Sequence, residues 1–451
     1  MTDSFKLRRA ENIVAGVEAS KPGASVPALE AAPAGYWPRR WILVSGCFLS
    51  IVVCYIDRVN ISYAILPMAK EFGWDTATQG WVLSSFFMGY LLTQLAGGWW
   101  AAHIGGRALL GFGVLWWSLF TALTPLAASW SLGALIGARF GMGLGEGVAF
   151  PAIYQLFGRW IPLHERARAA ALNGSGIPLG TVAATVLTPW LVVSFGWPMV
   201  FYVFGTLGVI WFAFWQFTSS ERPEDASGIH SSEVAYIRAH AVTEVANPAV
   251  PWGRILRSAS VWVLVFNHFC SNWGFYVILS WLPRYFADVH GLDLKGAGYA
   301  SLLPWLVMFA MANVGAQLAD GLLKRGYSVT FVRKLMQSIG FFGAAAALLA
   351  IGQVHTVPLA IALMCVALGL GSFALSGFGS NHLDIAPRYA GALMGLSNTG
   401  GTLPGVIGVT VTGYILEATG SWALVLAIAA GLYVVGGLAW LRFATGEKLF
   451  D

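Results

Sequence analysis

The feature of this sequence that most limits its fold is a series of twelve long apolar runs. Each is about as long as the roughly 20-residue helix that crosses a hydrocarbon layer about 30 Å thick. The runs are continuous rather than alternating, which argues against a transmembrane β-barrel. We therefore predict an all-α polytopic membrane protein with twelve transmembrane helices. The runs fall at about 41–66, 78–99, 108–129, 131–156, 169–195, 197–218, 260–286, 296–319, 330–353, 356–381, 389–415 and 421–442.

Composition supports this prediction. Of the 451 residues, 57% are hydrophobic and only 10% are charged, whereas soluble domains have about 25% charged residues. So little charge cannot cover a water-exposed surface of this size. The composition therefore excludes a soluble protein, a disordered protein and a nucleic-acid binder, despite a net charge of +5.

The runs form two groups of six. We expect a cytosolic tail over 1–40, a six-helix bundle over 41–218, a cytosolic central loop over 219–259, a second bundle over 260–443 and a short tail over 444–451. Within the central loop, 231–238 is predicted to form a short capped helix. Similar inner-loop sequences follow the second and eighth runs, at 98–107 and 316–325. Two pseudo-symmetric six-helix bundles favour a transporter with its site between the halves, working as a monomer in the bilayer.

Basic residues predict the orientation. With the N-terminus inside, the outer loops hold only Lys70, Arg284 and Lys295 of the 26 Lys and Arg residues. Two more lie within the spans, and the other 21 lie on the inner side. Because basic loops stay in the cytoplasm, this count predicts that both termini are cytoplasmic.

Four charged residues lie within predicted spans: Asp57, Arg58, Arg139 and Glu146. Each would cost roughly 2.5–3.5 kcal/mol at the centre of a lipid-facing helix, so we expect them to face a polar interior. Two guanidinium groups on one cavity suit a carboxylate or phosphate, because their planar forks match two oxygens. The acids could load and release protons. The alternative is a purely structural charge network.

The spacing of these residues adds detail. Arg139 and Glu146 are seven residues apart, which places them on one helix face with Cα atoms about 10 Å apart. This separation suits two groups on either side of a ligand. The glycines of the same span recur every fourth residue and predict a close helix-packing face. They are Gly133, Gly137, Gly141 and Gly145.

Several polar residues of other spans are further candidates for substrate contact, each about as suited to linking helices. They are Tyr55, Tyr90 with Gln94, Asn272 and Tyr276 on one face with His268, and Asn398 with Thr402. The four cysteines, Cys47, Cys54, Cys270 and Cys365, lie in apolar runs without a CxxC or His/Cys cluster and are interpreted as small buried hydrophobic residues. We expect no metal site, no cofactor and no enzymatic activity.

Seven motifs also give the chain a family resemblance from about Trp37 to its end. It resembles the anion:cation symporter group of the major facilitator superfamily, which includes sialin, vesicular glutamate transporters and galactonate-type symporters, and is most similar to the plant plastid phosphate transporter 4 type. The motifs are 57–62, 143–148, 162–166, 332–336, 381–389, 397–404 and 443–448.

The resemblance implies residue roles. Arg58 and Arg139 match the anion-binding arginines of the group, and Glu146 matches its proton-coupling acid. Asp57 matches an acid of the proton-coupled sugar-acid members. Tyr55, Tyr90 and Asn398 match substrate contacts in those members.

Three positions depart from the family pattern. Ala102 replaces an inner-loop Asp of the superfamily, and Leu83 and Ser271 stand where the vesicular glutamate branch carries His and Arg. Glutamate-type vesicular transport is therefore disfavoured. Residues 1–40 contain several acids, unlike a transit peptide, so a bacterial inner membrane is favoured over a plastid envelope or thylakoid.

The sequence thus predicts a secondary active transporter that moves a small organic carboxylate or inorganic phosphate together with protons. One alternative is sodium-coupled phosphate transport. Another, from a different class, is a nutrient sensor built on a transport fold.

Overall fold

The computed structural model describes residues 36–240 and 250–450, and the described chain is helical without a β-strand. The predicted N-terminal tail up to residue 35, and residues 241–249 of the central loop, lie outside the described residues. The first half contains α2 (Arg39–Phe72), α3 (Thr76–Ile104), α4 (Gly106–Trp130), α5 (Leu132–Glu146), α6 (Ala149–Trp160), α7 (Leu163–Gly174), α8 (Gly176–Phe195) and α9 (Trp197–Thr218).

The second half repeats this plan. Between the halves lie η1 (Pro223–Asp225), α10 (Ser231–Ala239) and α11 (Trp252–Ile255). The second half itself contains α12 (Ala259–His290), α13 (Leu294–Lys324), α14 (Val329–Ile351), α15 (Val357–Gly371), η2 (Leu375–Gly379), α16 (Ser380–Ile385), η3 (Pro387–Tyr389), α17 (Ala390–Thr419) and α18 (Trp422–Phe443). The predicted short helix at 231–238 is confirmed as α10, with His230 as its N-cap.

The described helices make twelve passes when α5 and α6, α7 and α8, and α15 and α16 are each counted as one. Eight of the passes are long and apolar enough to cross a membrane on their own composition. The other four are α3, α12 and α17, which lie where the two halves meet, and the interrupted α5–α6 pass. Passes that face a polar interior need less apolar sequence than passes that face lipid. The prediction of an all-α polytopic membrane protein is therefore confirmed.

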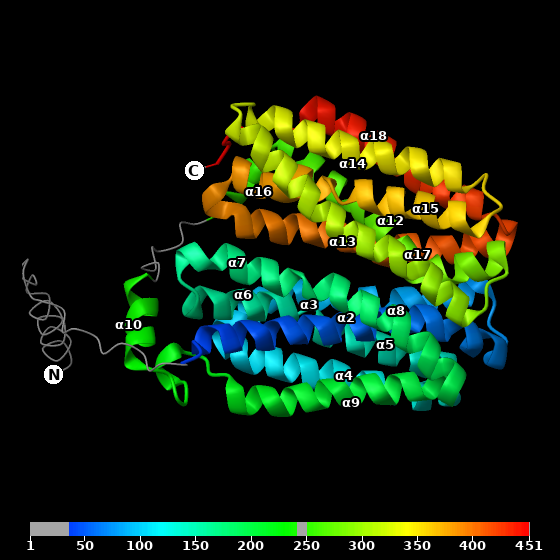
Figure 1. Ribbon diagram of the computed structural model, residues 1–451, viewed down its shortest axis with the longest axis horizontal. Helices are drawn as coiled ribbons and strands as arrows, with labels where there is room; N and C mark the ends of the chain where they lie inside the picture. Colours follow the sequence, from blue (N-terminus) through cyan, green and yellow to red (C-terminus); the bar gives the residue numbers. More distant parts are fainter. Residues whose placement is uncertain (1–35, 241–249, 451) are drawn as a thin grey trace, which may run out of the picture.

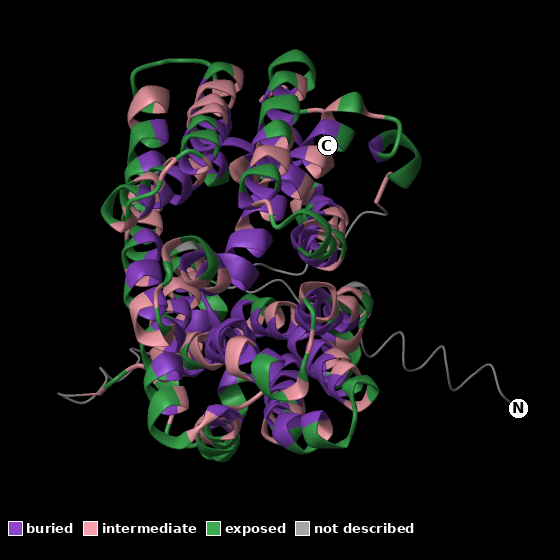
Figure 2. Ribbon diagram, turned by 90° about the vertical axis from the view of Figure 1, so that its right-hand side faces the viewer, coloured by how far each residue is buried: buried purple, intermediate pink, exposed green. Residues whose placement is uncertain are grey.

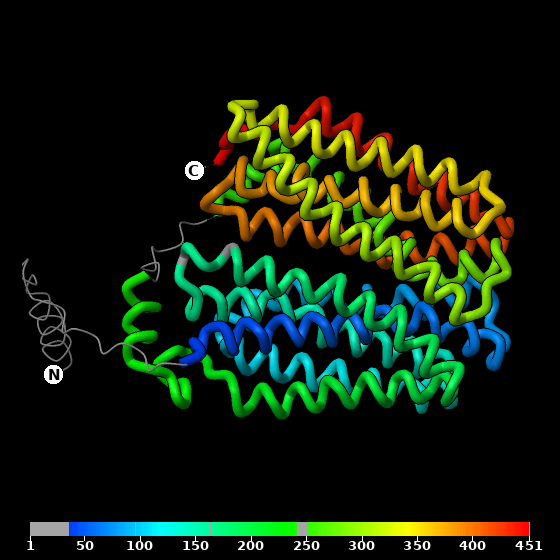
Figure 3. The backbone as a smooth tube through the Cα atoms, viewed as in Figure 1, coloured from blue at the N-terminus to red at the C-terminus, as the bar shows by residue number. Residues whose placement is uncertain are grey.

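The two halves stack with their helices running along the same direction (Figure 1). They meet through α3 against α17, α8 against α13, and α2 against α12. The trace in Figure 3 shows that both described ends of the chain lie at one end of the molecule, which is also the end where Figure 1 labels α10. We call this end the terminal face, where α2 begins and α18 ends. The opposite end, where α2 and α12 end, is the far face.

Burial follows the expected pattern for a membrane bundle. Buried residues concentrate on the inner sides of the helices and exposed residues on the outside (Figure 2). Large apolar side chains are among the exposed residues, including Leu126, Phe214 and Phe217. An exposed apolar perimeter of this kind is suited to lipid rather than to water.

Glycine sets the closest helix crossings. A Cβ added at Gly143 would lie 2.0 Å from the backbone oxygen of Phe86, and one at Gly89 would lie 2.0 Å from that of Phe140. These contacts bring α3 and α5 together at a distance that no other residue permits. The predicted glycine face is only partly used, since Gly141 and Gly145 pack on α4 whereas Gly137 has no neighbouring heavy atom within 4 Å.

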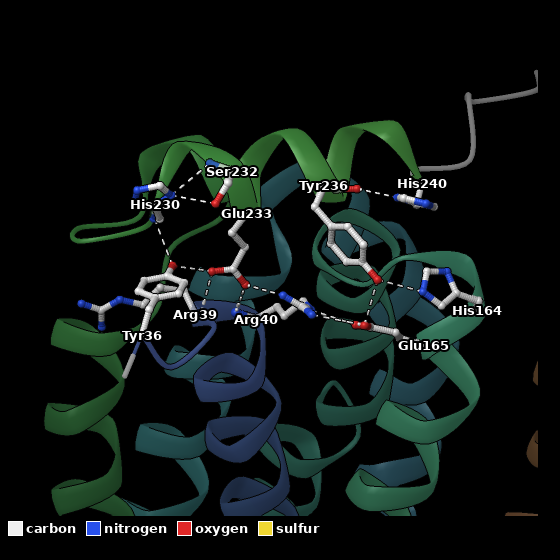
Figure 4. Close-up of polar contacts among 10 residues, drawn as sticks. All are labelled: Tyr36, Arg39, Arg40, His164, Glu165, His230, Ser232, Glu233, Tyr236 and His240. Atoms are coloured by element: carbon white, nitrogen blue, oxygen red, sulfur yellow. Dashed lines mark hydrogen bonds and ion pairs between the residues drawn. The ribbon is translucent and has the colours of Figure 1, made fainter. Parts of the chain in front are cut away.

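An ionic cluster at the terminal face attaches α10 to the first half (Figure 4). The buried carboxylate of Glu233 accepts hydrogen bonds from the backbone N–H groups of Arg39 and Arg40, at 2.9 and 3.1 Å, and so caps the start of α2. The Arg40 guanidinium bonds both Glu233 and Glu165 of α7. Burial next to this cluster raises the pKa of the Tyr36 phenol, and its hydrogen bond to Glu233 acts in the same direction.

Ala102 leaves the end of α3 without the Asp that the superfamily pattern places there, but another carboxylate lies at the start of α4. Glu221, just after α9, accepts hydrogen bonds from the backbone N–H groups of Gly106 and Arg107 at 3.1 and 2.8 Å and pairs with Arg159. It therefore supplies negative charge at the start of α4, where a helix N-terminus favours it. Gly105 leads into this turn with a φ of 95°, a conformation that favours glycine.

The second half has its own ion pair at this face, in which Asp384 pairs with Arg333 of α14 at 2.6 Å.

Candidate functional site

The centre of the candidate site is a buried ion pair between α2 and the end of α5. Arg58 donates from Nη2 and Nε to the same carboxylate oxygen of Glu146, at 2.8 and 3.2 Å. The two side chains are 4% and 0% exposed. Glu146 lies at the last residue of α5, where the pass is interrupted before α6. The sequence spacing suggested a ligand between Glu146 and Arg139, whereas the structure pairs Glu146 with Arg58.

Aromatic rings surround the Arg58 guanidinium. Its central carbon lies 4.6 Å from the ring of Tyr55, 4.9 Å from that of Phe86 and 5.0 Å from that of Tyr90. Tyr276, from α12 in the second half, packs on Phe87, with the ring centres 4.6 Å apart. Aromatic faces stabilise a cation that has lost its water. Two of the sequence candidates, Tyr55 and Tyr90, are thus brought together around Arg58 from two helices, and Tyr276 contacts Phe87 in the wall of the same site.

Cys54 lies one turn before Arg58 and also contacts the ion pair. Its thiol donates to Oε2 of Glu146 at 3.0 Å, and Nη2 of Arg58 lies 3.7 Å from its sulfur. The sequence interpretation of Cys54 as a small buried residue is correct for its burial but missed this hydrogen bond. The spacing of four residues from Arg58 on a helix was the available signal, because it places both side chains on one face.

Arg139 is the cation of the site that has no acidic partner in the described part of the chain. Its Nη1 contacts the sulfur of Met142 at 3.0 Å, and its Nε has no hydrogen-bond partner among the described residues. The residue is 1% exposed. Its guanidinium lies 5.6 Å from the Phe86 ring, so Phe86 contacts both arginines. A buried guanidinium with so few partners is costly unless an anion binds to it.

Asp57 is the second unpaired charge. Neither of its carboxylate oxygens has a hydrogen-bond partner among the described residues, and the side chain is fully buried. The Trp117 indole lies near it, and Glu146 and Arg139 act on it electrostatically. Asp57 and Arg58 are neighbours in sequence but point to different surroundings, as adjacent helical residues do.

A small enclosed cavity connects the two arginines. Its walls include α2, α3, α5 and, from the second half, α12. It is large enough for about one water molecule. In this conformation the site is therefore closed around its charged groups. The lining residues are Arg58, Ile61, Ser62, Leu83, Phe86, Phe87, Arg139, Leu279 and Ser280.

The remaining two candidates lie apart from this cluster. The side-chain amide of Asn272 donates to the backbone oxygen of Gly401 at 2.7 Å and so links α12 to α17. Asn398 is half-buried on α17, and its backbone oxygen accepts from Thr402, whose hydroxyl also contacts Gln94 of α3. Phe86, Trp117 and Met142 were missed by the sequence analysis, because apolar residues in a membrane span carry no signal of proximity to a charge.

In the described residues the site thus combines two buried arginines, two buried acids and phenol groups, between two six-helix halves. No group of three or more potential metal ligands occurs among the described residues. This arrangement is that of a membrane transporter. The chain belongs to the Major Facilitator Superfamily, whose family model matches residues 47–409. It is a transporter of that superfamily rather than an enzyme.

Relatives of known description cover most of the chain. A probable chloroplastic anion transporter, number 4 of rice (Oryza sativa subsp. japonica), is 48% identical over 92% of this chain and 70% of its own length. The chloroplastic ascorbate transporter of Arabidopsis thaliana is 48% identical over 92% and 76%. The chloroplastic sodium-dependent phosphate transport protein 1 of the same plant is 46% identical over 92% and 81%.

Solved structures share the fold at low identity. A D-xylose–proton symporter has a TM-score of 0.73 and 13% identity, covering 91% of this chain and 99% of its own. An inward-facing, occupied bacterial homologue of the human lysosomal transporter Spinster has a TM-score of 0.72 and 17% identity, covering 90% and 97%. The predicted superfamily fold of two six-helix bundles is therefore confirmed.

The predicted compartment is wrong. The sequence analysis favoured a bacterial inner membrane, whereas four relatives that are 46–48% identical to this chain are plant proteins named as chloroplastic, which points to a plastid. The error came from giving weight to the composition of residues 1–40. The helix bundle packs in lipid in the same way in any membrane, so its physical chemistry does not indicate which membrane contains it.

Proposed function

We propose that this chain is a proton-coupled symporter of a small anion, an organic carboxylate or inorganic phosphate, that binds between Arg58 and Arg139. The observation that carries the proposal is the unequal pairing of the two buried arginines. Arg58 is held by Glu146, whereas Arg139 has no acidic partner among the described residues. One guanidinium is thus open to an anion, and the other can be released by a proton.

Protonation of Glu146 is the proposed coupling step. A proton on its carboxyl group removes the negative charge that holds Arg58 at 2.8 Å. Arg58 then needs another anion, since a buried unpaired guanidinium costs about 3–5 kcal/mol. A carboxylate or phosphate that reaches both arginines would meet this need. Proton and substrate therefore favour each other's binding, as coupled transport requires.

Charge balance supports the same mechanism. With Asp57, Glu146, Arg58 and Arg139 all ionised, the buried site has no net charge. A monovalent anion with one proton preserves this neutrality, and a divalent anion would need two protons, one on each acid. A net charge inside a membrane is disfavoured, so we expect one proton per negative charge of the substrate.

The relatives support the class of substrate. Their names specify ascorbate and phosphate, which are both small oxygen-rich anions. Guanidinium groups bind such oxygens with paired hydrogen bonds. Tyr55 and Tyr90 lie against Arg58, and Tyr276 lies against Phe87 of the cavity wall, so these residues would offer phenol groups to the neutral part of the substrate.

Movement of the halves would expose this site alternately to each side. On the far-face side, beginning at the wall of the cavity itself, the halves are joined by hydrogen bonds from Ser62 to Leu279 at 3.0 Å and from Thr410 to Ser84 at 2.7 Å. Toward the terminal face, Gln94, Asn272 and Asn398 are only half-buried. We propose that breaking the far-face contacts, while the terminal side closes, moves the site between compartments.

The deciding experiment uses Glu146→Gln in proteoliposomes. The amide cannot be charged, so uptake driven by a pH gradient should fail, while exchange of labelled for unlabelled substrate should continue. Ascorbate and phosphate are the first substrates to test. Uptake by Glu146→Gln that still follows the pH gradient would overturn the coupling role of Glu146. Asp57→Asn, measured in parallel, reports whether a second proton moves.

Sodium coupling is the second candidate, and it rests on two observations. One relative is named as sodium-dependent, and both oxygens of the buried Asp57 carboxylate lack a hydrogen-bond partner among the described residues. Replacing external sodium with an organic cation at constant pH separates the candidates. Proton symport predicts unchanged uptake without sodium. Sodium symport predicts that uptake is lost without sodium and is also lost in Asp57→Asn with sodium present.

A further inference from the structure

A second pocket lies at the terminal face, far from the charged site described above. It has a volume of about 640 Å³ and is open to the surroundings. One wall is α11 with the turn that leads into α12, and the other is the C-terminal segment. The lining residues are Pro251, Trp252, Gly253, Arg254, Arg257, Ser258, Leu449 and Phe450.

The C-terminal wall of this pocket is fixed in place. The backbone N–H groups of Leu449 and Phe450 both donate to the backbone oxygen of Ile385, at 2.8 and 3.1 Å. The Phe450 side chain is only 4% exposed. Further back, the N–H of Gly446 donates to the Thr330 hydroxyl at 2.8 Å. The pocket is therefore a built feature of the second half, rather than a space beside a loose chain end.

Two arginines give the pocket its charge. Arg254 and Arg257 are exposed, and neither forms an ion pair with an acid in the described part of the chain. Arg254 lies over the Phe450 ring, 5.9 Å from its centre. Other arginines of this face, such as Arg40 and Arg333, are neutralised by carboxylates. The pocket thus presents positive charge without a counter-charge among the described residues.

Exposed apolar side chains, which we call the apolar border, lie in the same segment as the two arginines: Trp252 lines the pocket, and Leu256 and Trp262 lie outside its lining. Trp252, Leu256 and Trp262 are 44%, 44% and 50% exposed. The Trp262 indole donates to the backbone oxygen of Leu256 at 2.8 Å, which holds the apolar border against the first turn of α12. Exposed tryptophan beside arginine at the end of a membrane pass is typical of the lipid headgroup region.

We propose that this pocket binds the phosphate headgroup of an anionic lipid. Arg254 and Arg257 hold the phosphate oxygens, and Trp252, Leu256 and Trp262 contact the start of the acyl chains. The apolar border favours a lipid over a free anion, because a dissolved ion gains nothing from exposed tryptophan and leucine. Basic pockets at the ends of membrane helices are suited to such headgroups.

The test is a thermal-shift titration of the purified full chain in neutral detergent with phosphatidylglycerol or phosphatidylcholine. Phosphatidylglycerol should raise the Tm of the wild type, and phosphatidylcholine should not. The double variant Arg254→Gln/Arg257→Gln should weaken the apparent affinity for phosphatidylglycerol about 30-fold, from about 1 kcal/mol or about fivefold per arginine. The matched control Arg325→Gln/Arg388→Gln removes two exposed arginines of the same half and should keep the wild-type affinity.

Three results would overturn the proposal. They are the absence of a phosphatidylglycerol shift in the wild type, an unchanged affinity in Arg254→Gln/Arg257→Gln, and an equal loss in the control variant. A parallel titration with inorganic phosphate distinguishes the source of the phosphate group. If inorganic phosphate gives a shift that the Arg254→Gln/Arg257→Gln variant loses, the pocket is a free-anion site and not a lipid site.

Discussion

In our proposal, substrate binding depends most on Arg139, whose guanidinium has no acidic partner among the described residues. Arg58 already has a carboxylate at 2.8 Å, and this ion pair offsets the cost of burying the Arg58 charge before a substrate binds. Arg139 has only the Met142 sulfur at 3.0 Å, which is a weak acceptor. An arriving anion therefore gains most from Arg139, and the two arginines should respond differently to substitution.

Arg139→Lys should lower uptake at least tenfold, or by about 1.4 kcal/mol, while the protein still folds. Lysine keeps the charge but loses the planar fork that matches two oxygens. Initial rates of uptake at equal expression measure this effect. Arg325→Lys, an exposed arginine of the terminal face, serves as the control. Near-normal uptake by Arg139→Lys would show that this arginine has a structural role.

The thiol of Cys54 should influence the proton-dependent step. It donates to the charged form of Glu146 at 3.0 Å, and its removal makes that charged form less favourable. Cys54→Ala should therefore move the midpoint of the pH profile of uptake to higher pH. Cys47→Ala, in the same helix but away from the ion pair, should leave the profile unchanged. Identical profiles for both variants would contradict a role of Cys54 in coupling.

At the scale of helices, the crossing of α3 and α5 positions the site. Gly143 lies against the backbone of Phe86, and Phe86 contacts both arginines. The α5–α6 pass is interrupted directly after Glu146, and its counterpart in the second half is interrupted by η2 between α15 and α16. Equivalent passes of the two halves thus share a local irregularity, and such irregularities are frequent at functional sites.

Gly143→Ala should disrupt the site, because its Cβ would lie 2.0 Å from the Phe86 oxygen and would push α3 away from α5. Overpacking of this kind costs about 1–3 kcal/mol. Thermal unfolding in detergent and uptake measure the two consequences. Gly137→Ala, on the same helix with no heavy atom within 4 Å of the added Cβ, should affect neither. Equal behaviour of the two variants would refute this account of the crossing.

For the whole molecule, the essential feature is that the two halves meet mainly through three helix pairs, α3 with α17, α8 with α13 and α2 with α12. Their contacts at the far face include the Trp81 indole, which donates to the Tyr414 hydroxyl at 2.9 Å, and Glu417, which accepts from the backbone of Thr76 at 2.8 Å. Both residues of the first pair are partly exposed. Hydrogen bonds of this kind contribute about 1 kcal/mol each, so breaking these two costs little beside the packing of the helices.

Linking the halves at this point should stop transport. In Trp81→Cys/Tyr414→Cys, a short bis-methanethiosulfonate reagent should join α3 to α17 through two disulfides and abolish uptake, and a reductant that cleaves these disulfides should restore it. The native cysteines are buried, which limits their reaction. Each single variant, treated in the same way, should keep its activity. Full uptake by the cross-linked double variant would show that these helices need not separate.

The sequence alone determined the class of fold and the inward position of four charged residues. Twelve apolar runs require helices, because backbone groups in lipid must bond within their own segment. Charges as costly as Arg58, Arg139, Asp57 and Glu146 must then face inward. These inferences follow from local composition and need no knowledge of which helices touch.

Only the tertiary structure decided how those charges are paired. Glu146 is seven residues from Arg139 and 88 from Arg58, yet it bonds to Arg58, because the glycine crossing of α3 with α5 and the packing of the passes bring distant turns together. Tertiary packing also decided the contact of Cys54 with Glu146, the position of Phe86 between the two arginines, and the pocket at the terminal face lined by Phe450. Pairing depends on the relative position of helices, which is set by side-chain fit across the bundle and is not written in any single segment.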